Sequence, residues 1–314
     1  MNGTAEPAAI SVEGLHKSFR GVRAVDGLDL RVASGGVYGL VGRNGAGKTT
    51  ALRTIMGLLR PDRGRAQVFG VDLIRGRPAS RERVAYVSQD LHLPGWMSTA
   101  ELSRYCSHFY CRWDAALATD LIRRWAIDAK RQVALLSGGQ RRRVAVLLAL
   151  ASRAEVLVLD EPAAGLDPIA RRALIEELIE ALARQDGCTV IFSTHIIADL
   201  ERLADTIGLM DRGRLTSEHR TEDLRTTTKR VQVVFPGDVP PAGFSIPGAI
   251  RSTTAGAVVT AIARLPDEQA LAQARAIPGA RVQVFSLSLE DIMIELIGPD
   301  VPQDATVEDE GVEA

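Results

Sequence analysis

A glycine-rich segment around residue 45 has the residue types and spacing of a phosphate-binding loop. Residues 42–49 read GRNGAGKT and match the pattern G-x-x-x-x-G-K-[ST]. Glycines let backbone N–H groups approach phosphate oxygens closely, and a helix expected at residues 48–56 directs its positive end at the same phosphates. Lys48 supplies a positive charge to the β- and γ-phosphates, and the Thr49 hydroxyl can bind Mg²⁺. The residues predicted to contact nucleotide here are Gly42, Asn44, Gly45, Ala46, Gly47, Lys48, Thr49 and Thr50.

Two adjacent carboxylates follow a short apolar run later in the chain. Residues 156–161 read VLVLDE, so that Asp160 and Glu161 stand at the end of a predicted buried strand. Carboxylates in such a place are costly unless they are hydrogen-bonded or bound to a metal. We therefore predict that Asp160 holds Mg²⁺ through water. Glu161 is predicted to orient or deprotonate the water that attacks the γ-phosphate.

A second pair of glycines, in the segment LSGGQ at residues 136–140, precedes a predicted amphipathic helix. Ser137 suits the N-cap of that helix, and Gly138 and Gly139 leave backbone N–H groups open, which indicates a second anion site. A run of three arginines at residues 141–143 follows in the first turn, where cations oppose the helix dipole. Either a nearby phosphate offsets this conflict, or the arginines form a solvated basic turn.

The elements that must position these residues alternate between short strands and amphipathic helices from about residue 11 to residue 215. Such alternation predicts an α/β domain with a mainly parallel sheet. Apolar runs at residues 37–41, 156–159 and 189–192 are each followed by residues of the candidate site, as expected where ligands bind beyond the carboxyl ends of strands. Between about residues 90 and 150 helices dominate, and Ser98 followed by Glu101 predicts a capping box at the start of one helix. We expect a helical subdomain inserted there.

The last third of the chain has a different pattern. Strands are predicted at residues 231–235, 258–263 and 281–285, with a closing helix at 288–297. The predicted organisation is a disordered N-terminus at 1–10, a nucleotide-binding domain at 11–218, a small α+β accessory domain at 219–298 and an acidic disordered tail at 299–314.

Composition excludes several classes of protein. The 314 residues carry 38 basic and 39 acidic side chains, so the charge balance does not favour nucleic acid as the main partner. The three cysteines have no spacing typical of a disulfide framework or a zinc site. We expect no signal peptide, and the longest apolar run, residues 144–151, is shorter than the roughly 20 residues that span a bilayer. Any membrane role would then require a partner chain.

Kinases, GTPases and helicases also contain the pattern that residues 42–49 match. The segment LSGGQ at residues 136–140 is more specific, because it resembles the signature motif of the ATP-binding cassette (ABC) family. The resemblance covers residues 10–215 in the family's order and spacing. It implies that Gln89 touches Mg²⁺ or water, that Asp167 belongs to the D-loop, and that His195 contacts the γ-phosphate. It also implies that Phe19 stacks on adenine, although Phe19 could instead pack in the core. The Ala163–Ala164 pair departs from the more polar residues usual before the D-loop.

The resemblance further implies an ATPase with a P-loop NTPase fold that uses ATP and Mg²⁺. In the family each ATP lies between the phosphate loop of one subunit and the signature residues of another, here Ser137, Gly138, Gly139 and Gln140. A second copy or a paralogous ATPase subunit is therefore expected. An integral membrane permease would hold the chain at the cytoplasmic face of the membrane.

Residues 109–114 and 288–292 are similar to ATPase subunits of ABC-2 type exporters. The alternative is a soluble ABC ATPase that acts on nucleic acid or ribosomes. The tandem cassettes, zinc cysteine clusters or long coiled coil of such relatives do not appear in the sequence.

Overall fold

The computed structural model describes residues 8–185, 187–237, 239–264 and 271–297, and the chain divides into two compact units, 1–221 and 222–314. The border expected after residue 218 was wrong by a few residues, because it falls inside strand β9 (Arg214–Arg220), which pairs with β8 (Thr206–Asp211) of the first unit. The expected disorder at 1–10 was wrong for residues 8–10, which begin strand β1 (Ala8–Phe19). Residues 1–7 and the predicted tail at 299–314 lie outside the described residues.

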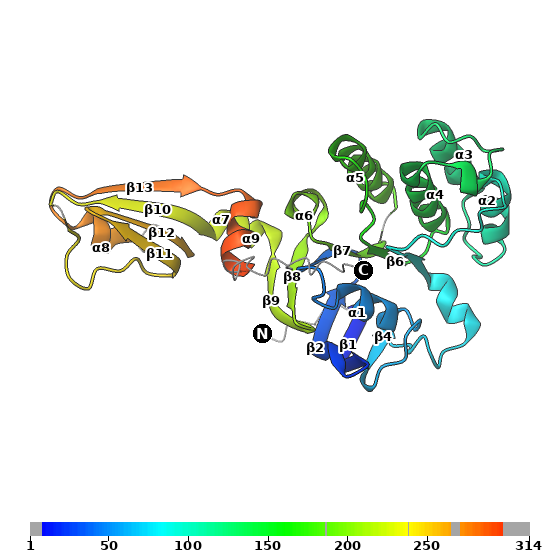
Figure 1. Ribbon diagram of the computed structural model, residues 1–314, viewed down its shortest axis with the longest axis horizontal. Coiled ribbons are helices and arrows are strands. Elements are labelled where there is room, and N and C mark those ends of the chain that lie inside the picture. The colour runs from blue at the N-terminus through cyan, green and yellow to red at the C-terminus, as the bar shows by residue number, and fades with distance from the viewer. Residues whose placement is uncertain (1–7, 186, 238, 265–270, 298–314) are drawn as a thin grey trace, which may run out of the picture. The chain divides into compact units, whose positions relative to one another are not determined.

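A six-stranded sheet forms the centre of the first unit, with the order β5-β6-β7-β3-β8-β9 (Figure 1). Its other strands are β3 (Val37–Val41), β5 (Val84–Val87), β6 (Val156–Asp160) and β7 (Thr189–Thr194). All neighbouring pairs are parallel except β8 with β9. Every residue of β6 and β7 is buried, as expected for parallel strands covered on both faces. The predicted α/β fold is confirmed.

Three helices in this unit, α1 (Lys48–Ile55), α5 (Pro168–Ala183) and α6 (Ile197–Leu203), are placed by the loops that follow β3, β6 and β7. The predicted cap of α5 is present, because the Asp167 carboxylate accepts hydrogen bonds from the backbone N–H groups of Ile169 and Ala170, both at 3.0 Å. Helix α1 begins directly at Lys48, so the loop that precedes it is continuous with its N-terminus.

A separate antiparallel sheet, of order β2-β1-β4, precedes and flanks the parallel one. It contains β1, β2 (Val22–Ala33) and β4 (Arg63–Val68). Its buried side chains Ile10, Leu15 and Leu28 pack in one core with Leu52 of α1. The sequence pattern of residues 11–215 predicted a mainly parallel sheet and did not predict this additional antiparallel sheet.

The predicted helical subdomain contains α2 (Thr99–Ser107), α3 (Ala115–Arg124) and α4 (Gly138–Ala151), with short 3₁₀ turns at η1 (Pro78–Arg83) and η2 (Val133–Leu135). The capping box of Ser98 and Glu101 is confirmed at the start of α2. Residues 144–151 of α4 are all buried, because α4 packs against α2, α3, α5 and β5. Helix α4 is thus the central helix of the subdomain.

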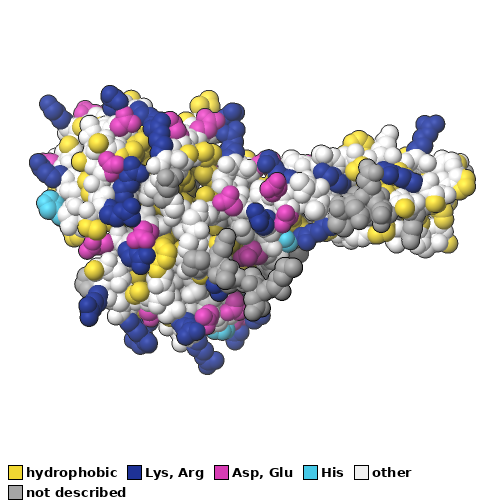
Figure 2. Space-filling view, turned by 180° about the vertical axis from the view of Figure 1, so that it is seen from behind, with side chains coloured by type: hydrophobic (Ala, Val, Ile, Leu, Met, Phe, Trp, Pro, Cys, Tyr) yellow, Lys and Arg dark blue, Asp and Glu magenta, His cyan; other side chains and the backbone are white. Residues whose placement is uncertain are grey.

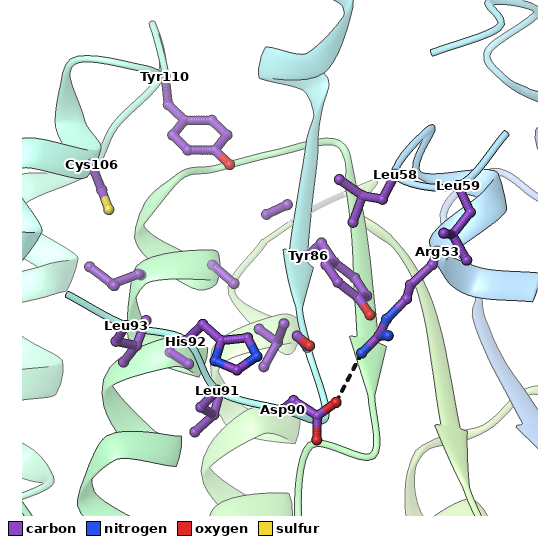
Figure 3. A pocket seen from close by; sticks show the side chains of 16 residues that line it. Arg53, Leu58, Leu59, Tyr86, Asp90, Leu91, His92, Leu93, Cys106 and Tyr110 are labelled. Carbon is purple, nitrogen blue, oxygen red and sulfur yellow. Dashed lines mark hydrogen bonds and ion pairs between the residues drawn. The ribbon is translucent and has the colours of Figure 1, made fainter. Parts of the chain in front are cut away.

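A groove of about 590 Å³ lies where the helical subdomain meets strand β5 and the end of α1 (Figure 3). One wall carries Arg53, Leu58 and Tyr86, and the opposite wall carries residues of α2 and α4. The Arg53 guanidinium lies 3.2 Å from the Asp90 carboxylate at one end of the groove.

The second unit is built on an antiparallel sheet of order β11-β12-β10-β13. Its elements are α7 (Thr221–Thr227), β10 (Thr228–Val234), β11 (Ala249–Ala255), β12 (Val258–Arg264), α8 (Ala272–Arg275), β13 (Arg281–Ser286) and α9 (Leu289–Ile297). Strand β11 was not predicted, because the residues AIRSTTA are all exposed and show no alternation of apolar and polar side chains.

On the face drawn in Figure 2, basic and acidic side chains are interspersed rather than segregated. Within the described ranges, none of the helices combines the length and the apolar character that crossing a membrane requires.

Asp114 connects the start of α3 to the segment that follows α4. Its carboxylate caps α3 by accepting a hydrogen bond from the Leu117 N–H at 2.8 Å and forms an ion pair with Arg153 at 2.7 Å. The Leu117 N–H and the Arg153 guanidinium hold the pKa of Asp114 below its ordinary value.

We expect Asp114→Ala to lower the free energy of unfolding by about 1–2 kcal/mol at pH 7, because a cap and an ion pair are lost together. Since the pKa is lower in the folded state, this contribution is complete above the ordinary aspartate pKa of about 3.9 and is lost as the pH falls through the folded-state pKa. Urea denaturation between pH 7 and pH 3 tests this.

Asp120→Ala on the same helix, which removes only surface ion pairs with Arg123 and Arg124, is the control. Equal losses in both variants would contradict the prediction.

Candidate nucleotide-binding site

The loop between β3 and α1 has a backbone that only glycine accommodates at two positions. Gly47 has a φ of 100°, and a Cβ built there would lie 2.1 Å from the Ala24 carbonyl oxygen. A Cβ at Gly42 would lie 2.2 Å from the carbonyl oxygen of Met210. These close approaches fix the loop against neighbouring backbone. The N–H groups of the first turn of α1 have no intrahelical acceptor and are free for an anion.

Lys48 places a buried ammonium group beside this loop. Its side chain is 6% exposed, and Nζ donates a hydrogen bond to the Gly42 carbonyl at 2.6 Å. The same nitrogen lies 3.6 Å from Oε1 of Glu161. Burial lowers the pKa of Lys48, while the Glu161 carboxylate acts in the opposite direction. A buried cation at a helix N-terminus suits a phosphate ligand.

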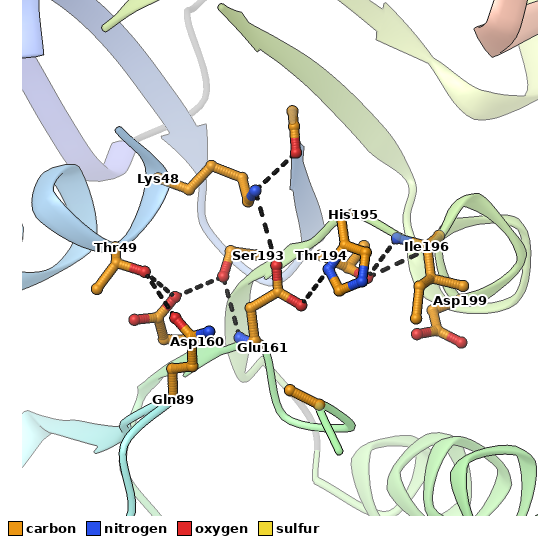
Figure 4. Close-up of polar contacts among 12 residues, drawn as sticks. Lys48, Thr49, Gln89, Asp160, Glu161, Ser193, Thr194, His195, Ile196 and Asp199 are labelled. Atoms are coloured by element: carbon orange, nitrogen blue, oxygen red, sulfur yellow. Dashed lines mark hydrogen bonds and ion pairs between the residues drawn. The ribbon is translucent and has the colours of Figure 1, made fainter. Parts of the chain in front are cut away.

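The Asp160 carboxylate, at the end of β6, is held by hydroxyl groups from three other elements. Figure 4 shows two of them, those of Thr49 and Ser193. Oδ1 accepts a hydrogen bond from Ser193 Oγ at 2.7 Å and lies 3.0 Å from Thr49 Oγ1. Oδ2 accepts a hydrogen bond from the Tyr86 hydroxyl at 3.1 Å. The carboxylate is therefore fixed between β5, β7 and α1.

The oxygens of Thr49, Gln89 and Asp160 converge on one point. Thr49 Oγ1 lies 3.3 Å from Gln89 Oε1 as well as 3.0 Å from Asp160. Mg²⁺ favours oxygen ligands and binds through one or two carboxylates together with phosphates and water. The donor set therefore fits Mg²⁺ bound beside a nucleotide phosphate.

Glu161 adopts a backbone conformation that is unusual for a side chain of its size. Its φ is 48°, a left-handed value that costs about 1–3 kcal/mol in non-glycine residues and clusters at active sites. Its N–H donates to Ser193 Oγ at 3.0 Å. Its carboxylate is buried between Lys48 and His195, whose Nδ1 lies 2.9 Å from Oε2. The strained turn thus aims the carboxylate into the site.

A pocket of about 340 Å³ lies over these groups. It is lined by Ala24, residues 44–50, Gln89 and Glu161. Ser137, Gly138, Gly139 and Gln140 are absent from its lining as far as the structure describes the chain. Ser137 instead caps α4, where its hydroxyl accepts the Gln140 N–H at 3.2 Å, as predicted.

The remaining predicted residues lie outside this cluster. A Cβ at Gly139 would lie 3.2 Å from Leu166, so the start of α4 adjoins the segment that ends at Asp167. Phe19 ends β1 and is 45% exposed, with Lys17 Nζ 5.4 Å from its ring centroid. The interpretation of Phe19 as a core residue is therefore wrong, and its ring is open to a ligand.

Sequence analysis missed two residues of the site. Ser193 comes directly after the apolar run at residues 189–192 and was given no role, yet its hydroxyl joins Asp160 to the Glu161 N–H. Its position opposite Asp160 in the pairing of β6 with β7 could have identified it once the sheet order was known. Nothing in the sequence marks Tyr86 as a residue of the site, because the pattern of β5 does not predict that its hydroxyl reaches the next strand.

Comparisons with known proteins agree on one family. The family model described as "ABC transporter" matches residues 25–164. The chain is 39% identical over 234 residues to "Daunorubicin resistance ATP-binding protein DrrA3" of Streptomyces coeruleorubidus, covering 72% of this chain and 73% of that protein. It is 33% identical over 312 residues to "Nod factor export ATP-binding protein I" of Ralstonia nicotianae, covering 95% and 97%. A solved structure titled "Structure of ATP binding subunit of ABC transporter" is similar with a TM-score of 0.61 and 28% identity, over 69% of this chain and 92% of that one.

We expect Tyr86→Phe to raise the Mg²⁺ concentration needed for half-maximal ATP turnover by about 10-fold or more, because partners of metal-binding groups typically contribute 10–100-fold to metal affinity. Metal-free ATP binding should stay unchanged. Tyr110→Phe is the matched control, since its hydroxyl donates to the Val84 carbonyl of β5, at 3.4 Å, and makes no contact with Asp160 among the described residues. Equal Mg²⁺ dependence in wild type and Tyr86→Phe would refute the role.

Proposed function

Because the chain belongs to the ABC transporter family, we propose that it is the ATP-hydrolysing subunit of an exporter whose membrane permease is a separate chain. The observation that carries the proposal is the cluster of Lys48, Asp160, Glu161 and His195 at the carboxyl edge of the parallel sheet, beside a pocket that Lys48 and Glu161 line. Relatives are named as ATP-binding proteins of daunorubicin resistance and of Nod factor export. As a member of this family, the chain binds and hydrolyses ATP.

Different residues around the pocket bind different parts of the nucleotide. Backbone N–H groups of residues 44–50 and the Lys48 ammonium bind the phosphates, and the exposed ring of Phe19 stacks on adenine. Thr49, Gln89 and Asp160 hold Mg²⁺. When bound, Mg²⁺ neutralises negative charge on the β- and γ-phosphates.

Glu161 and His195 act on the attacking water and the γ-phosphate. Glu161 orients the water and accepts its proton, while Lys48, 3.6 Å away, keeps that carboxylate beside the phosphate site. His195 holds the second carboxylate oxygen at 2.9 Å and contacts the γ-phosphate from its half-exposed ring. Ser193 fixes the backbone of Glu161 and so preserves this geometry.

A second chain completes the site. The signature residues at 137–140 do not line the pocket of their own chain within the described residues, although they form an open helix N-terminus suited to phosphate. We infer that two chains face each other, so that the signature motif of each covers the nucleotide of the other. ATP then favours the closed dimer, and hydrolysis lets it reopen.

The groove between α1, β5 and the helical subdomain is the site where we place the permease. Asp90 and Ser88 line it and flank Gln89 in the chain, so a segment bound there adjoins the nucleotide site. Leu58 is an exposed apolar side chain of the groove, and Leu59, Leu91 and Leu93 also line it, which suits an apolar permease segment. The chain would thereby be held at the cytoplasmic face of the membrane. No observation favours the nucleic-acid alternative.

Replacing Glu161 by Gln tests the catalytic part of the proposal. We expect ATP hydrolysis to fall by about 100- to 10,000-fold, because the general base is lost. ATP binding should persist, and sedimentation analysis should find a dimer only when ATP is present. Unchanged hydrolysis in Glu161→Gln would overturn the assignment of this residue, and a monomer with ATP would overturn the paired arrangement of two identical chains.

Placing a charge in the groove tests the permease contact. Leu58 is 60% exposed and lies in the groove, so Leu58→Arg should fold and keep its basal ATPase activity. We expect the variant to leave the membrane fraction of cells that express the whole transporter, because a charge in an apolar contact is costly. Val239→Arg, at a position in the second unit that is 75% exposed, is the control. Retention of Leu58→Arg on membranes would exclude the groove as the main contact.

A further inference from the structure

The three arginines at the start of α4 lie in three different environments. Arg141 donates to the Leu136 carbonyl at 2.8 Å, and Arg143 lies 3.7 Å from the Glu177 carboxylate. Arg142 is only 8% exposed. The interpretation as a solvated basic turn is therefore wrong for Arg142.

The Arg142 guanidinium donates hydrogen bonds to three backbone carbonyls of two other segments. Nη1 bonds the Ser88 carbonyl at 3.1 Å, and Nη2 bonds the carbonyls of Gln89 at 3.1 Å and Ala164 at 3.3 Å. Ser88 and Gln89 follow β5, and Ala164 lies between Glu161 and the cap of α5. One side chain thus joins the helix of the signature motif to both segments.

The chemistry of this contact requires arginine. The planar guanidinium presents several N–H donors in a fixed fork, whereas an ammonium group is a compact point charge on a flexible stem. Backbone carbonyls left without partners in a buried place are costly. Burial lowers the Arg142 pKa, whereas the nearby carboxylates of Asp160, Asp90 and Glu161 act in the opposite direction. An arginine guanidinium stays protonated in proteins, so these carbonyls hold a cation.

We propose that Arg142 is a positioning residue that fixes the signature motif of its own chain relative to Gln89 and to the segment leading to Asp167. A movement of Gln89 in response to nucleotide is then transmitted through Arg142 to residues 137–140. The nucleotide state of one half-site thereby sets the placement of the signature motif offered to the other chain. This inference rests on the proposed function, in which that motif covers the nucleotide of a second chain.

Loss of the Arg142 contacts should weaken dimer formation but not ATP binding, whereas a general loss of structure would weaken both. Among the described residues, Arg142 does not line the nucleotide pocket, so ATP binding by the single chain should not depend on it. Formation of the ATP-bound dimer should depend on it, because the signature motif would no longer be held in register with Gln89.

The test uses full-length Glu161→Gln protein as the parent, with Arg142→Gln or Arg142→Lys added. A fluorescent ATP analogue measures binding to the single chain, and sedimentation measures the ATP concentration that produces the dimer. We expect binding within about 2-fold of the parent and an increase of about 10-fold or more in the ATP needed for dimerisation by Arg142→Gln, with a smaller increase for Arg142→Lys. Arg123→Gln, an 80% exposed arginine of α3, is the matched control.

Hydrogen–deuterium exchange gives a readout that does not require a dimer. In the parent, ATP should slow exchange at residues 86–90 and at 137–141 together, whereas in Arg142→Gln only residues 86–90 should respond. A joint response in Arg142→Gln overturns the proposal, as do equal losses of ATP binding and dimerisation. If the parent itself remains monomeric with ATP, the paired arrangement of identical chains fails, and the exchange pattern still decides the role of Arg142.

Discussion

The placement of the Asp160 carboxylate is the constraint on which the rest of the site depends. The group is completely buried at the end of an apolar strand, where an unpaired charge would oppose folding. Hydroxyl groups from α1, β5 and β7 satisfy it. These three contacts exist only when the sheet has its native order, so the same interactions that stabilise a buried charge also place the magnesium ligands and the following residue, Glu161.

The strained backbone of Glu161 is tolerated next to the fixed carboxylate of Asp160. This left-handed backbone would be unfavourable in an open turn, but the Glu161 N–H is bonded to Ser193, which also bonds Asp160. The Glu161 carboxylate is then held between a buried lysine and a half-exposed histidine. Lys48 belongs to the glycine loop and His195 follows β7, so the reacting groups are fixed by the carboxyl edge of the sheet and need no rearrangement to meet.

The helical subdomain adds a second level of organisation. Its central helix begins with the signature residues, and the side chain of Arg142 connects that beginning to the loop after β5. The groove lies on the other side of the same loop and contains Ser88 and Asp90. A short segment around Gln89 therefore adjoins the nucleotide site, the groove and the signature helix, which suits a subunit that must relate nucleotide state to a partner.

The sequence by itself determined the parallel core, the glycine loop, the adjacent carboxylates and the caps at Ser98, Ser137 and Asp167, because each depends on local periodicity or on residues a few positions apart. It could not reveal the pairing of β1 with β4 or the exposed strand β11, since the first joins distant segments and the second has no buried alternation. The hairpin of β1 and β2, with Phe19 opposite Val22, is local but was not recognised. Only the tertiary structure decided the roles of Tyr86, Ser193 and Arg142. Tyr86 and Ser193 have partners that are 32 to 74 residues away in the sequence, and Arg142 has partners that are 22 to 54 residues away. Such contacts arise from the order of strands and the packing of α4, which no local pattern encodes.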